Sequence, residues 1–297
     1  MAENEYISVE KAALLWRISE RSVRNYCALG RVAGAVLDGK TWKIPRDAQK
    51  PERQMRHSVR KESVLEVLRR EKDAGLKGGL YNKIQIDLTF NSNHIEGSRL
   101  SHEQTRFIFE TATLGVAREN VRIDDIIETV NHFRCVDLVI DSAKSRLTES
   151  FIKQLHFILK TGTSDSRKSW FKTGGYKMLE NEVGGKETAK PGEVPARMKQ
   201  LLSEYNAKKS VTLDDILDFH VSFEKIHPFQ DGNGRIGRLL LFKECLKHDI
   251  TPFIITEELK FFYYRGIAEW QTERGFLRDT CLTAQDEMRT VLGRFGV

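Results

Sequence analysis

Twelve consecutive residues, His227 to Arg238, hold side chains of the kinds that phosphate chemistry requires. They read HPFQDGNGRIGR and include one histidine, one aspartate, three glycines and two arginines. The ordinary pKa of histidine lies close to neutral, so His227 could take a proton from an attacking hydroxyl. Asp231 offers a carboxylate oxygen, and Mg²⁺ commonly binds through one or two carboxylates and the phosphates of its substrate. These residue types predict a site for a nucleotide polyphosphate.

The glycines and arginines of this segment predict where the phosphates would lie. Gly232 and Gly234 let backbone N–H groups approach a ligand closely, and N–H groups at the start of a helix form a pocket for anions. Arg235 and Arg238 are three residues apart, so both can reach the same phosphates. The loop holds no serine or cysteine nucleophile, which favours direct transfer to an acceptor hydroxyl. Each feature alone is common in structural turns, but their combination in this order favours a functional site.

Two helices must position this loop. Apolar residues recur at helical spacing before and after it, so we predict helices over Leu213–Ile226 and Gly234–His248. Pro228 cannot continue the first helix. The remaining periodicity beyond residue 60 is helical as well. The other predicted helices are Ser63–Lys72, Leu76–Asn91, His102–Leu114, Ile123–Ser142, Glu149–Leu159, Pro195–Asn206 and Leu259–Thr272.

One stretch departs from this helical pattern. Thr173–Pro195 is rich in Gly, Lys and Glu, with Gly184 and Gly185 at its centre. We predict a surface hairpin here, called the flap below, with extended pieces at Tyr176–Leu179 and Glu182–Val183. The expected fold class is mainly α, a helical bundle with a β-hairpin flap and a small domain before it.

The first 50 residues predict that separate small domain. Two short helices, Val9–Trp16 and Ser19–Leu29, precede a hairpin that turns at Asp38 and Gly39. This pattern is a helix-turn-helix with a small wing, and it resembles MerR-type and excisionase-type modules. Residues 51–60 are polar and basic and predict a linker, which leaves 61–297 as the second domain.

The charge of this N-terminal part favours a polyanion as its partner. Residues 1–60 hold 12 Lys and Arg against 7 Asp and Glu. Arg21, Arg24 and Asn25 would project from the second helix, where a recognition helix meets DNA. Docking onto a protein is the alternative. Readers of this kind often work as pairs, so a homodimer would favour DNA binding.

Composition excludes several other classes of protein. The 297 residues are 40% hydrophobic and 30% charged, which is enough for one large core or for one core plus a small domain. No apolar run is long enough to span a bilayer, and the first residues lack the features of a signal peptide. The four cysteines are scattered, without a CxxC pair. We therefore expect a cytoplasmic protein with reduced thiols and no contact with a membrane.

The catalytic loop resembles a known family signature. HPFQDGNGRIGR matches the Fic signature HxFxDGNGRxxR at every fixed position. The resemblance extends over roughly residues 80 to 290, because the flap lies upstream of the loop and the pair Tyr263 and Tyr264 lies downstream, as in Fic proteins. It implies AMPylation, in which AMP passes from Mg-ATP to a Ser, Thr or Tyr hydroxyl of a target protein, or of the enzyme itself, and pyrophosphate is released.

The resemblance also implies a role for each residue of the loop, which spans 227–238. His227 is similar to the family's general base, and Asp231 to its Mg²⁺ ligand. Gly232, Asn233 and Gly234 resemble the anion hole, and the positions to Arg238 complete the ATP site. Kinase-like relatives of the Doc branch carry Lys where this chain has Gly234. The implied phosphate-binding residues are Asp231, Gly232, Asn233, Gly234, Arg235, Ile236, Gly237 and Arg238.

Downstream aromatic residues would face the base of the nucleotide. Tyr263 and Tyr264 are similar to the family's adenine-side residues, since an aromatic face can stack on a base. Many relatives place an asparagine several residues further on, where this chain has Trp270 and Gln271. That departure leaves the choice of base open, and transfer of UMP, GMP or phosphocholine stays an alternative. The resemblance further implies that the flap holds a target segment in extended form.

A second motif predicts a built-in brake. Residues 92–97 read SNHIEG and match the Fic inhibitory motif [S/T]xxxE[G/N], with Ser92 at its first position and Glu96 as its acid. We expect an inhibitory helix near residues 86–97, with Glu96 paired to Arg238 so that the arginine is withheld from the γ-phosphate. Some Fic enzymes use this glutamate to remove AMP from the target. A de-AMPylating hydrolase therefore stays open, as does a DNA-binding regulator whose Fic domain senses a nucleotide.

Overall fold

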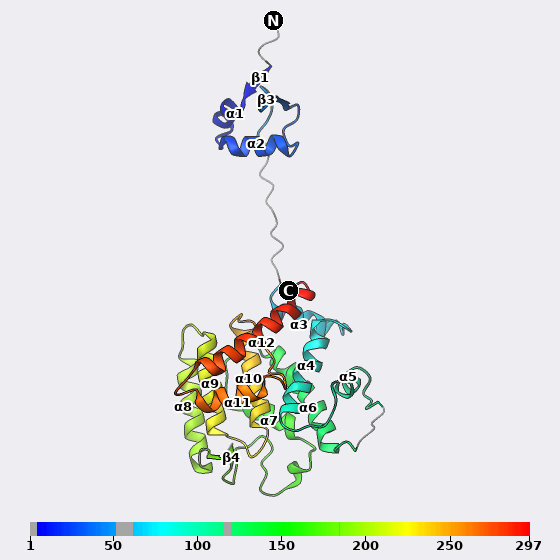
Figure 1. The fold of residues 1–297 in the computed structure, drawn as a ribbon, viewed down its shortest axis with the longest axis vertical. Coiled ribbons are helices and arrows are strands. Elements are labelled where there is room, and N and C mark those ends of the chain that lie inside the picture. Colours follow the sequence, from blue (N-terminus) through cyan, green and yellow to red (C-terminus); the bar gives the residue numbers. More distant parts are fainter. Residues whose placement is uncertain (1–4, 52–61, 116–119, 184) are drawn as a thin grey trace. The chain divides into compact units, whose positions relative to one another are not determined.

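The computed structural model describes residues 5–51, 62–115, 120–183 and 185–297, and the chain divides into two compact units (Figure 1). The first unit comprises residues 1–60 and the second comprises residues 61–297. Apart from residue 51, the linker predicted over 51–60 lies outside the described residues.

The N-terminal unit packs two helices against a small sheet. Helices α1 (Val9–Trp16) and α2 (Glu20–Ala28) each begin after a serine whose side chain accepts an N–H of the first turn. The antiparallel sheet has the order β1-β3-β2, with β1 at Tyr6–Ser8, β2 at Val36–Asp38 and β3 at Thr41–Pro45. Strand β1 was not expected from the sequence, and it pairs with the outer edge of the hairpin. Each unit thus has its own apolar core.

The larger unit is mainly helical, which confirms the fold class expected for it. Its long α-helices surround α10, as Figure 1 shows. The helices are α3 (Val64–Asp73), α4 (Leu80–Ile95), α5 (His102–Thr111), α6 (Ile123–Asp141), α7 (Glu149–Lys160), α8 (Val194–Asn206), α9 (Leu213–Ile226), α10 (Asn233–Lys247), α11 (Lys260–Glu269) and α12 (Gly275–Arg294). Short 3-10 turns lie at Asp165–Arg167 and Pro191–Glu193.

Helix α10 is the centre of this unit. Its residues are buried on every side, from Asn233 to Leu246 except Gly234, and it contacts α4, α6, α7 and α9. A helix that is apolar all round belongs in a core, yet the start of α10 carries Arg235 and Arg238. Because these charges are buried, each of them needs partners from the neighbouring helices.

The structure corrects three expectations about elements in the larger unit. Helix α4 begins at Leu80 and not at Leu76, because Gly78 and Gly79 precede its first turn, and it continues to Ile95. Helix α12 follows the last predicted helix and was not expected. The flap strands are β4 (Glu182–Val183) and β5 (Lys186–Glu187), whereas Tyr176–Leu179 forms no strand. The backbone of that segment bonds to the catalytic loop instead.

Two further observations bear on the class of protein. Among the described residues, no helix combines the length and the apolar character needed to cross a bilayer. All four cysteines are buried and free of disulfide bonds.

Replacing Gly266 with alanine should destabilise the larger unit. A Cβ at this position of α11 would lie 2.6 Å from the backbone of Leu277 in α12, so the two helices would have to separate. We expect a loss of about 1 to 3 kcal/mol in the free energy of unfolding, measured in urea. Gly293→Ala is the matched control, because a Cβ there meets no atom within 4 Å. Equal stability of the two variants would contradict this account of helix packing.

Candidate active site

The connection between α9 and α10 is a tight turn with a left-handed residue at each end. A capping box between Thr212 and Asp215 fixes the start of α9, and the helix ends where His227 takes φ 50° and ψ 62°. The chain turns again at Gly232, whose φ of 84° is readily available only to glycine. The sequence between these two residues is therefore held as a compact loop directly before α10.

Buried contacts hold this loop in place. The ring of Phe229 is fully buried and stacks on His156 of α7, with centroids 4.0 Å apart. Asn233 accepts the Phe229 N–H through Oδ1 and donates to the Phe229 carbonyl through Nδ2, both at 2.8 Å. The side chain of Asn233 is thus committed to bracing the loop. Only its backbone N–H is left for the predicted anion hole.

The first turn of α10 presents N–H groups that have no acceptor within the helix. These belong to Asn233, Gly234 and Arg235, as at the start of any α-helix. The N–H of Ile236 bonds to the Gly232 carbonyl, and the Ile236 side chain is buried in the core. Gly237 faces the interior, where a Cβ would meet Glu224. Ile236 and Gly237 were predicted to bind phosphate, but both face the protein interior and contribute to packing.

His227 is partly buried beside the loop. Its Nδ1 atom is buried without a hydrogen-bond partner among the described residues. Burial, followed by the positive charge of Lys177, lowers the pKa of His227 to about 4. The imidazole is neutral at physiological pH and so has a free lone pair. This is the protonation state that a general base requires.

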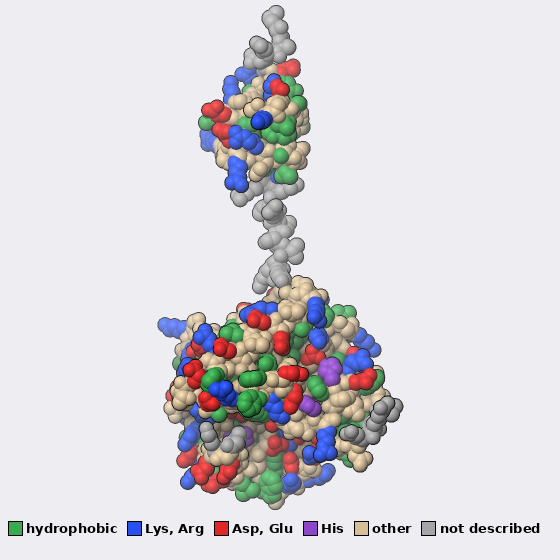
Figure 2. All heavy atoms as spheres, viewed as in Figure 1, with side chains coloured by type: hydrophobic (Ala, Val, Ile, Leu, Met, Phe, Trp, Pro, Cys, Tyr) green, Lys and Arg blue, Asp and Glu red, His purple; other side chains and the backbone are tan. Residues whose placement is uncertain are grey.

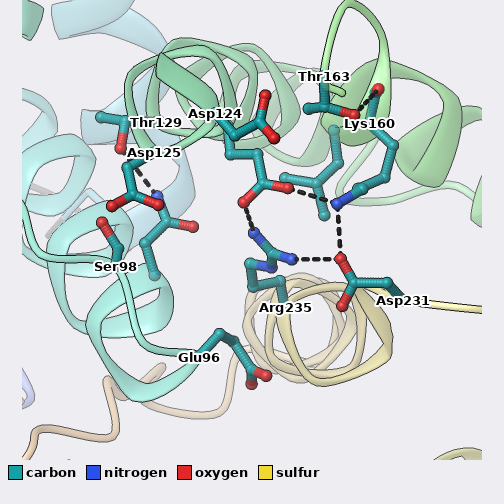
Figure 3. Close-up of polar contacts among 12 residues, drawn as sticks. Glu96, Ser98, Asp124, Asp125, Thr129, Lys160, Thr163, Asp231 and Arg235 are labelled. Atoms are coloured by element: carbon teal, nitrogen blue, oxygen red, sulfur yellow. Dashed lines mark hydrogen bonds and ion pairs between the residues drawn. The ribbon is translucent and has the colours of Figure 1, made fainter. Parts of the chain in front are cut away.

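Asp231 belongs to a closed ring of four charged side chains (Figure 3). Its Oδ2 lies 2.5 Å from Nζ of Lys160 and 3.2 Å from Nη2 of Arg235. Glu128 of α6 completes the ring, because it pairs with Lys160 through one oxygen at 2.5 Å and with Arg235 through the other. Lys160 also reaches Asp165 at 3.3 Å. Two carboxylates and two cations therefore alternate around this ring.

The ring keeps Asp231 ionised. Burial opposes the charged form, but Arg235 and Lys160 outweigh it and hold the pKa of Asp231 well below its usual range. The side chain of Lys160 is 1% exposed and that of Asp231 is 46% exposed, so the carboxylate still meets solvent. Sequence reasoning missed Lys160 and Glu128, which lie far from the loop in sequence. Only a lysine at the last position of an apolar helix could have hinted at them.

Arg238 is held by the segment that carries the predicted brake. Its Nε donates to Oγ of Ser92 at 3.1 Å, and its Nη2 donates to the Ser92 carbonyl at 2.9 Å and to Oε1 of Glu96 at 2.7 Å. Arg238 and Arg235 together outweigh burial and lower the pKa of Glu96, which is therefore a carboxylate. The two arginines were expected to reach the same phosphates, but here Arg235 pairs with Glu128 and Asp231 whereas Arg238 pairs with Glu96.

Glu96 also lies against the first turn of α10. It is the residue that caps the C-terminus of α4, and a Cβ built on Gly234 would lie 2.3 Å from Glu96 Oε1. Figure 3 shows the Glu96 carboxylate apart from the contact between Lys160 and Asp231. A negative group is favourable at the start of a helix. Glu96 therefore has the charge and the location that a bound anion would have.

The aromatic residues of α11 differ in exposure. Tyr263 is 1% exposed, and its hydroxyl lies 2.6 Å from Nε2 of His220, so its ring is part of the core and cannot stack on a base here. Tyr264 is 39% exposed and keeps the role open. Trp270 is buried and donates to Asp218. The expectation for Tyr263 is corrected, because helical spacing alone did not show which tyrosine faces inward.

A second acid behind α10 also escaped sequence reasoning. Burial raises the pKa of Glu224 to about 8, and its Oε1 is buried without a hydrogen-bond partner among the described residues. It lies 4.0 Å from Nε2 of His220 and under Gly237. The sequence signal that could have identified Glu224 is its place three residues before His227, in the segment HVSFEKIH at residues 220–227.

The residues predicted to meet DNA lie on α2 of the N-terminal unit. Arg21, Arg24 and Asn25 are all exposed, and Arg24 pairs with Glu20 of the same helix at 2.6 Å. Figure 2 shows Lys and Arg side chains over the part of this unit where the two helices lie, with acidic side chains among them. Arg21 makes no ion pair among the described residues.

Comparison with protein families agrees with the geometry of the loop. Residues 146–244, which include His227, Asp231 and both arginines, match the model of the Fic/DOC family. This stretch is similar to the Fic/DOC family. The match begins near α7, which supplies Lys160, and ends within α10.

Curated relatives are similar to this chain at modest identity. The protein adenylyltransferase Fic of Culex quinquefasciatus is 26% identical over 201 residues, which cover 65% of this chain and 38% of that protein. The protein of the same name from Aedes aegypti is 27% identical over 188 residues, covering 60% of this chain and 36% of the relative. The chain thus spans less than two-fifths of the length of the relatives it matches.

Solved structures with a Fic domain share the fold. A Fic-domain-containing signaling protein from Bacteroides thetaiotaomicron superposes with a TM-score of 0.61 at 24% identity, covering 75% of this chain and 92% of that one. Residues 134–508 of Fic-1 from C. elegans give a TM-score of 0.61 at 20% identity, covering 78% of this chain and 72% of the other. At these identities the likeness shows the fold alone.

Removing Lys160 should destabilise the larger unit far more than removing its exposed neighbour Lys168. Lys160→Met leaves Glu128, Asp165 and Asp231 short of one buried cation, and loss of one partner from a buried ion pair costs about 3 to 5 kcal/mol. Lys168→Met is the control, because Lys168 pairs with the same Asp165 but is 46% exposed, and we expect a loss below about 1 kcal/mol. Urea unfolding measures both, and similar losses would refute the buried ring as a stabilising unit.

Proposed function

We propose that the Fic domain of this chain is a protein adenylyltransferase, which transfers AMP from Mg-ATP to a Ser, Thr or Tyr hydroxyl of a target protein or of the chain itself. One observation carries this proposal. A neutral histidine, an ionised aspartate and the free N–H groups at the start of α10 lie on one short connection. The names of the curated relatives support the same class of reaction.

The reaction divides among these groups as follows. The acceptor oxygen forms a bond to the α-phosphorus of ATP while the bond from that phosphorus to the pyrophosphate oxygen breaks. His227 takes the proton of the acceptor hydroxyl, and burial keeps the imidazole neutral for that step. The N–H groups of Gly234 and Arg235, with the guanidinium of Arg238, stabilise the negative charge of the phosphates.

The residues at Asp231 fit a magnesium ion that arrives with the nucleotide. Among the described residues, no cluster of three or more His, Cys, Asp or Glu could hold a metal by itself. A lone, partly exposed carboxylate suits Mg²⁺, which takes its remaining oxygens from phosphates and water. Asp231 would hold the ion, which would neutralise phosphate charge. In Figure 3 the second oxygen of Asp231 makes no drawn contact with its neighbours.

Glu96 acts as a brake in this proposal. It pairs with Arg238 and lies against Gly234, so it uses both a cation and part of the helix start that the terminal phosphates need. Its carboxylate is 26% exposed, at the edge of the site. ATP can therefore bind productively only when Glu96 moves away from α10.

Glu96→Gly should raise AMP transfer by at least ten-fold. The change frees Arg238 for phosphate, and label from α-³²P-ATP with Mg²⁺ reports transfer to the chain itself and to proteins of a cell lysate. Glu96→Gln should give a smaller increase, because the amide keeps its size but loses the charge. His227→Ala in the Glu96→Gly background should abolish the label.

Four outcomes would contradict the proposal in whole or in part. Lower transfer by folded Glu96→Gly would count against a brake, and loss of AMP removal from labelled protein in that variant would favour a de-AMPylating hydrolase. The absence of label from all variants, despite bound ATP, would favour a nucleotide sensor. Competition by UTP, GTP or CDP-choline would identify another transferred group.

The N-terminal unit supports a second, separate role. We propose that it is a winged helix-turn-helix module that binds DNA, because α2 follows α1 after a short turn and exposes Arg21 and Asn25 next to a β-hairpin. Arg24, the third residue predicted to meet DNA, is already paired with Glu20. A regulator with a catalytic Fic domain would combine both roles.

Arg21→Glu should weaken binding to duplex DNA by about ten-fold or more and lower the salt dependence of binding by about one ion. Lys11→Glu is the control, since Lys11 is exposed on α1 and the variant has the same net charge. Gel shifts at several salt concentrations measure both. Binding that is absent in the wild type, or equally weakened by both variants, would refute recognition by α2.

A further inference from the structure

Lys177 is a buried lysine at the root of the flap. Its side chain is 4% exposed, and its ammonium donates to three oxygens: Asn181 Oδ1 at 2.7 Å, Thr188 Oγ1 at 2.5 Å and the Ile226 carbonyl at 3.5 Å. Among the described residues no carboxylate forms an ion pair with it, although the charge of Glu180 acts on it electrostatically. Burying a cation without an ion-pair partner is costly, so the three acceptor oxygens must stabilise the ammonium in place of an acid.

Two of the acceptors lie on opposite arms of the flap. Asn181 directly precedes β4, and Thr188 directly follows β5. Thr188 Oγ1 also donates to the carbonyl of Asn181 at 2.9 Å. The ammonium of Lys177 therefore joins both arms at the base of this hairpin, which has only two residue pairs of its own.

The third acceptor lies directly before the catalytic loop. Ile226 is the last residue of α9, where carbonyls lack a helical N–H partner and where a positive charge is favourable. The backbone N–H of Lys177 donates to the Pro228 carbonyl at 2.9 Å. Lys177 thus bonds to the carbonyls on both sides of His227, through its side chain on one side and its backbone on the other.

His227 needs such support. A residue with a side chain is strained at a φ of 50°, and a strained residue persists only where its surroundings hold it. The flap adds a further bond to the same loop, from Asn181 Nδ2 to the Phe229 carbonyl at 3.2 Å. The flap and the backbone of His227 are accordingly fixed to one another.

We propose that Lys177 is a positioning residue that couples the flap to the catalytic histidine, so that a target segment bound along the flap is placed relative to His227 by one buried side chain. This inference rests on the proposed transfer reaction and adds what sets the distance between acceptor and base. It also explains why the segment around Tyr176 and Lys177 bonds to the loop and forms no strand.

Charge gives the coupling a measurable signature. Glu96 and Asp231 raise the pKa of His227, as does the backbone contact with Glu224, whereas Lys177 lowers it after burial. Removal of the Lys177 charge should therefore raise the pKa of His227 above about 4. Because the neutral imidazole is the active form, the acid limb of the transfer rate should move to higher pH. Burial also lowers the pKa of Lys177 itself to about 8, against the effect of Glu180.

Lys177→Met in the Glu96→Gly background is the decisive variant. We expect kcat for self-AMPylation to fall at least ten-fold with little change in KM for ATP, and the acid limb to shift upward. Thr188→Val, which removes one acceptor and keeps the lysine, should give an intermediate fall in kcat and no shift of the acid limb. Lys190→Met is the control, because Lys190 lies in the same flap after β5 but is exposed.

A readout independent of transfer separates this inference from the proposed function. NMR titration of the His227 Cε1–H resonance, assigned by its loss in His227→Ala, should show a raised pKa in Lys177→Met only, and limited proteolysis should cut the flap faster in that variant. An unchanged His227 pKa with unchanged proteolysis would overturn the coupling. A raised pKa and faster cleavage without AMP transfer by any variant would keep the coupling and reject the adenylyltransferase.

Discussion

The site depends on the tight connection between α9 and α10. Its two ends adopt left-handed backbone conformations, at His227 and at Gly232; glycine takes this conformation readily, whereas the histidine needs its surroundings to hold it. Burial of Phe229 against His156 and the two bonds from Asn233 fix what lies between them. A histidine and an aspartate four residues apart are thereby presented at the start of a helix whose remaining length is core.

Buried charge follows from that placement. Because α10 is central, Arg235 and Arg238 enter the interior and require partners from other helices. Arg235 receives Glu128 and Asp231, which also hold Lys160, and Arg238 receives Ser92 and Glu96. The first set joins the loop to α6 and α7. In the proposed function the second set is the regulatory one, because movement of Glu96 would free Arg238 for a phosphate.

The sequence was most informative where chemistry and helix signals are local. Pro228 and the apolar spacing before it predicted the bounds of α9 as the structure has them, and α10 differs by one residue at each end. Tyr263 could not be separated from Tyr264, because both lie within one turn and the inner face of α11 depends on α12, which was not expected. Tertiary packing decided that question.

The site residues that the sequence did not predict were missed for one physical reason. Lys160, Glu128 and Lys177 come from three different segments and act through long-range pairing, which no local pattern encodes. Lysines in helical or glycine-rich stretches usually face solvent. Their burial became evident only when α6, α7 and the flap were assembled around α10.

Gly234 has a consequence for how such a protein can change over generations. The absence of a side chain at this position leaves space for two groups. The Glu96 carboxylate occupies that face of α10, and in the proposed reaction a phosphate would need the same space. A larger residue would expel the glutamate but would also obstruct the nucleotide. In the proposed function a side chain at position 234 would obstruct the nucleotide, so lineages that lose the brake should carry substitutions at Ser92 or Glu96 and retain Gly234.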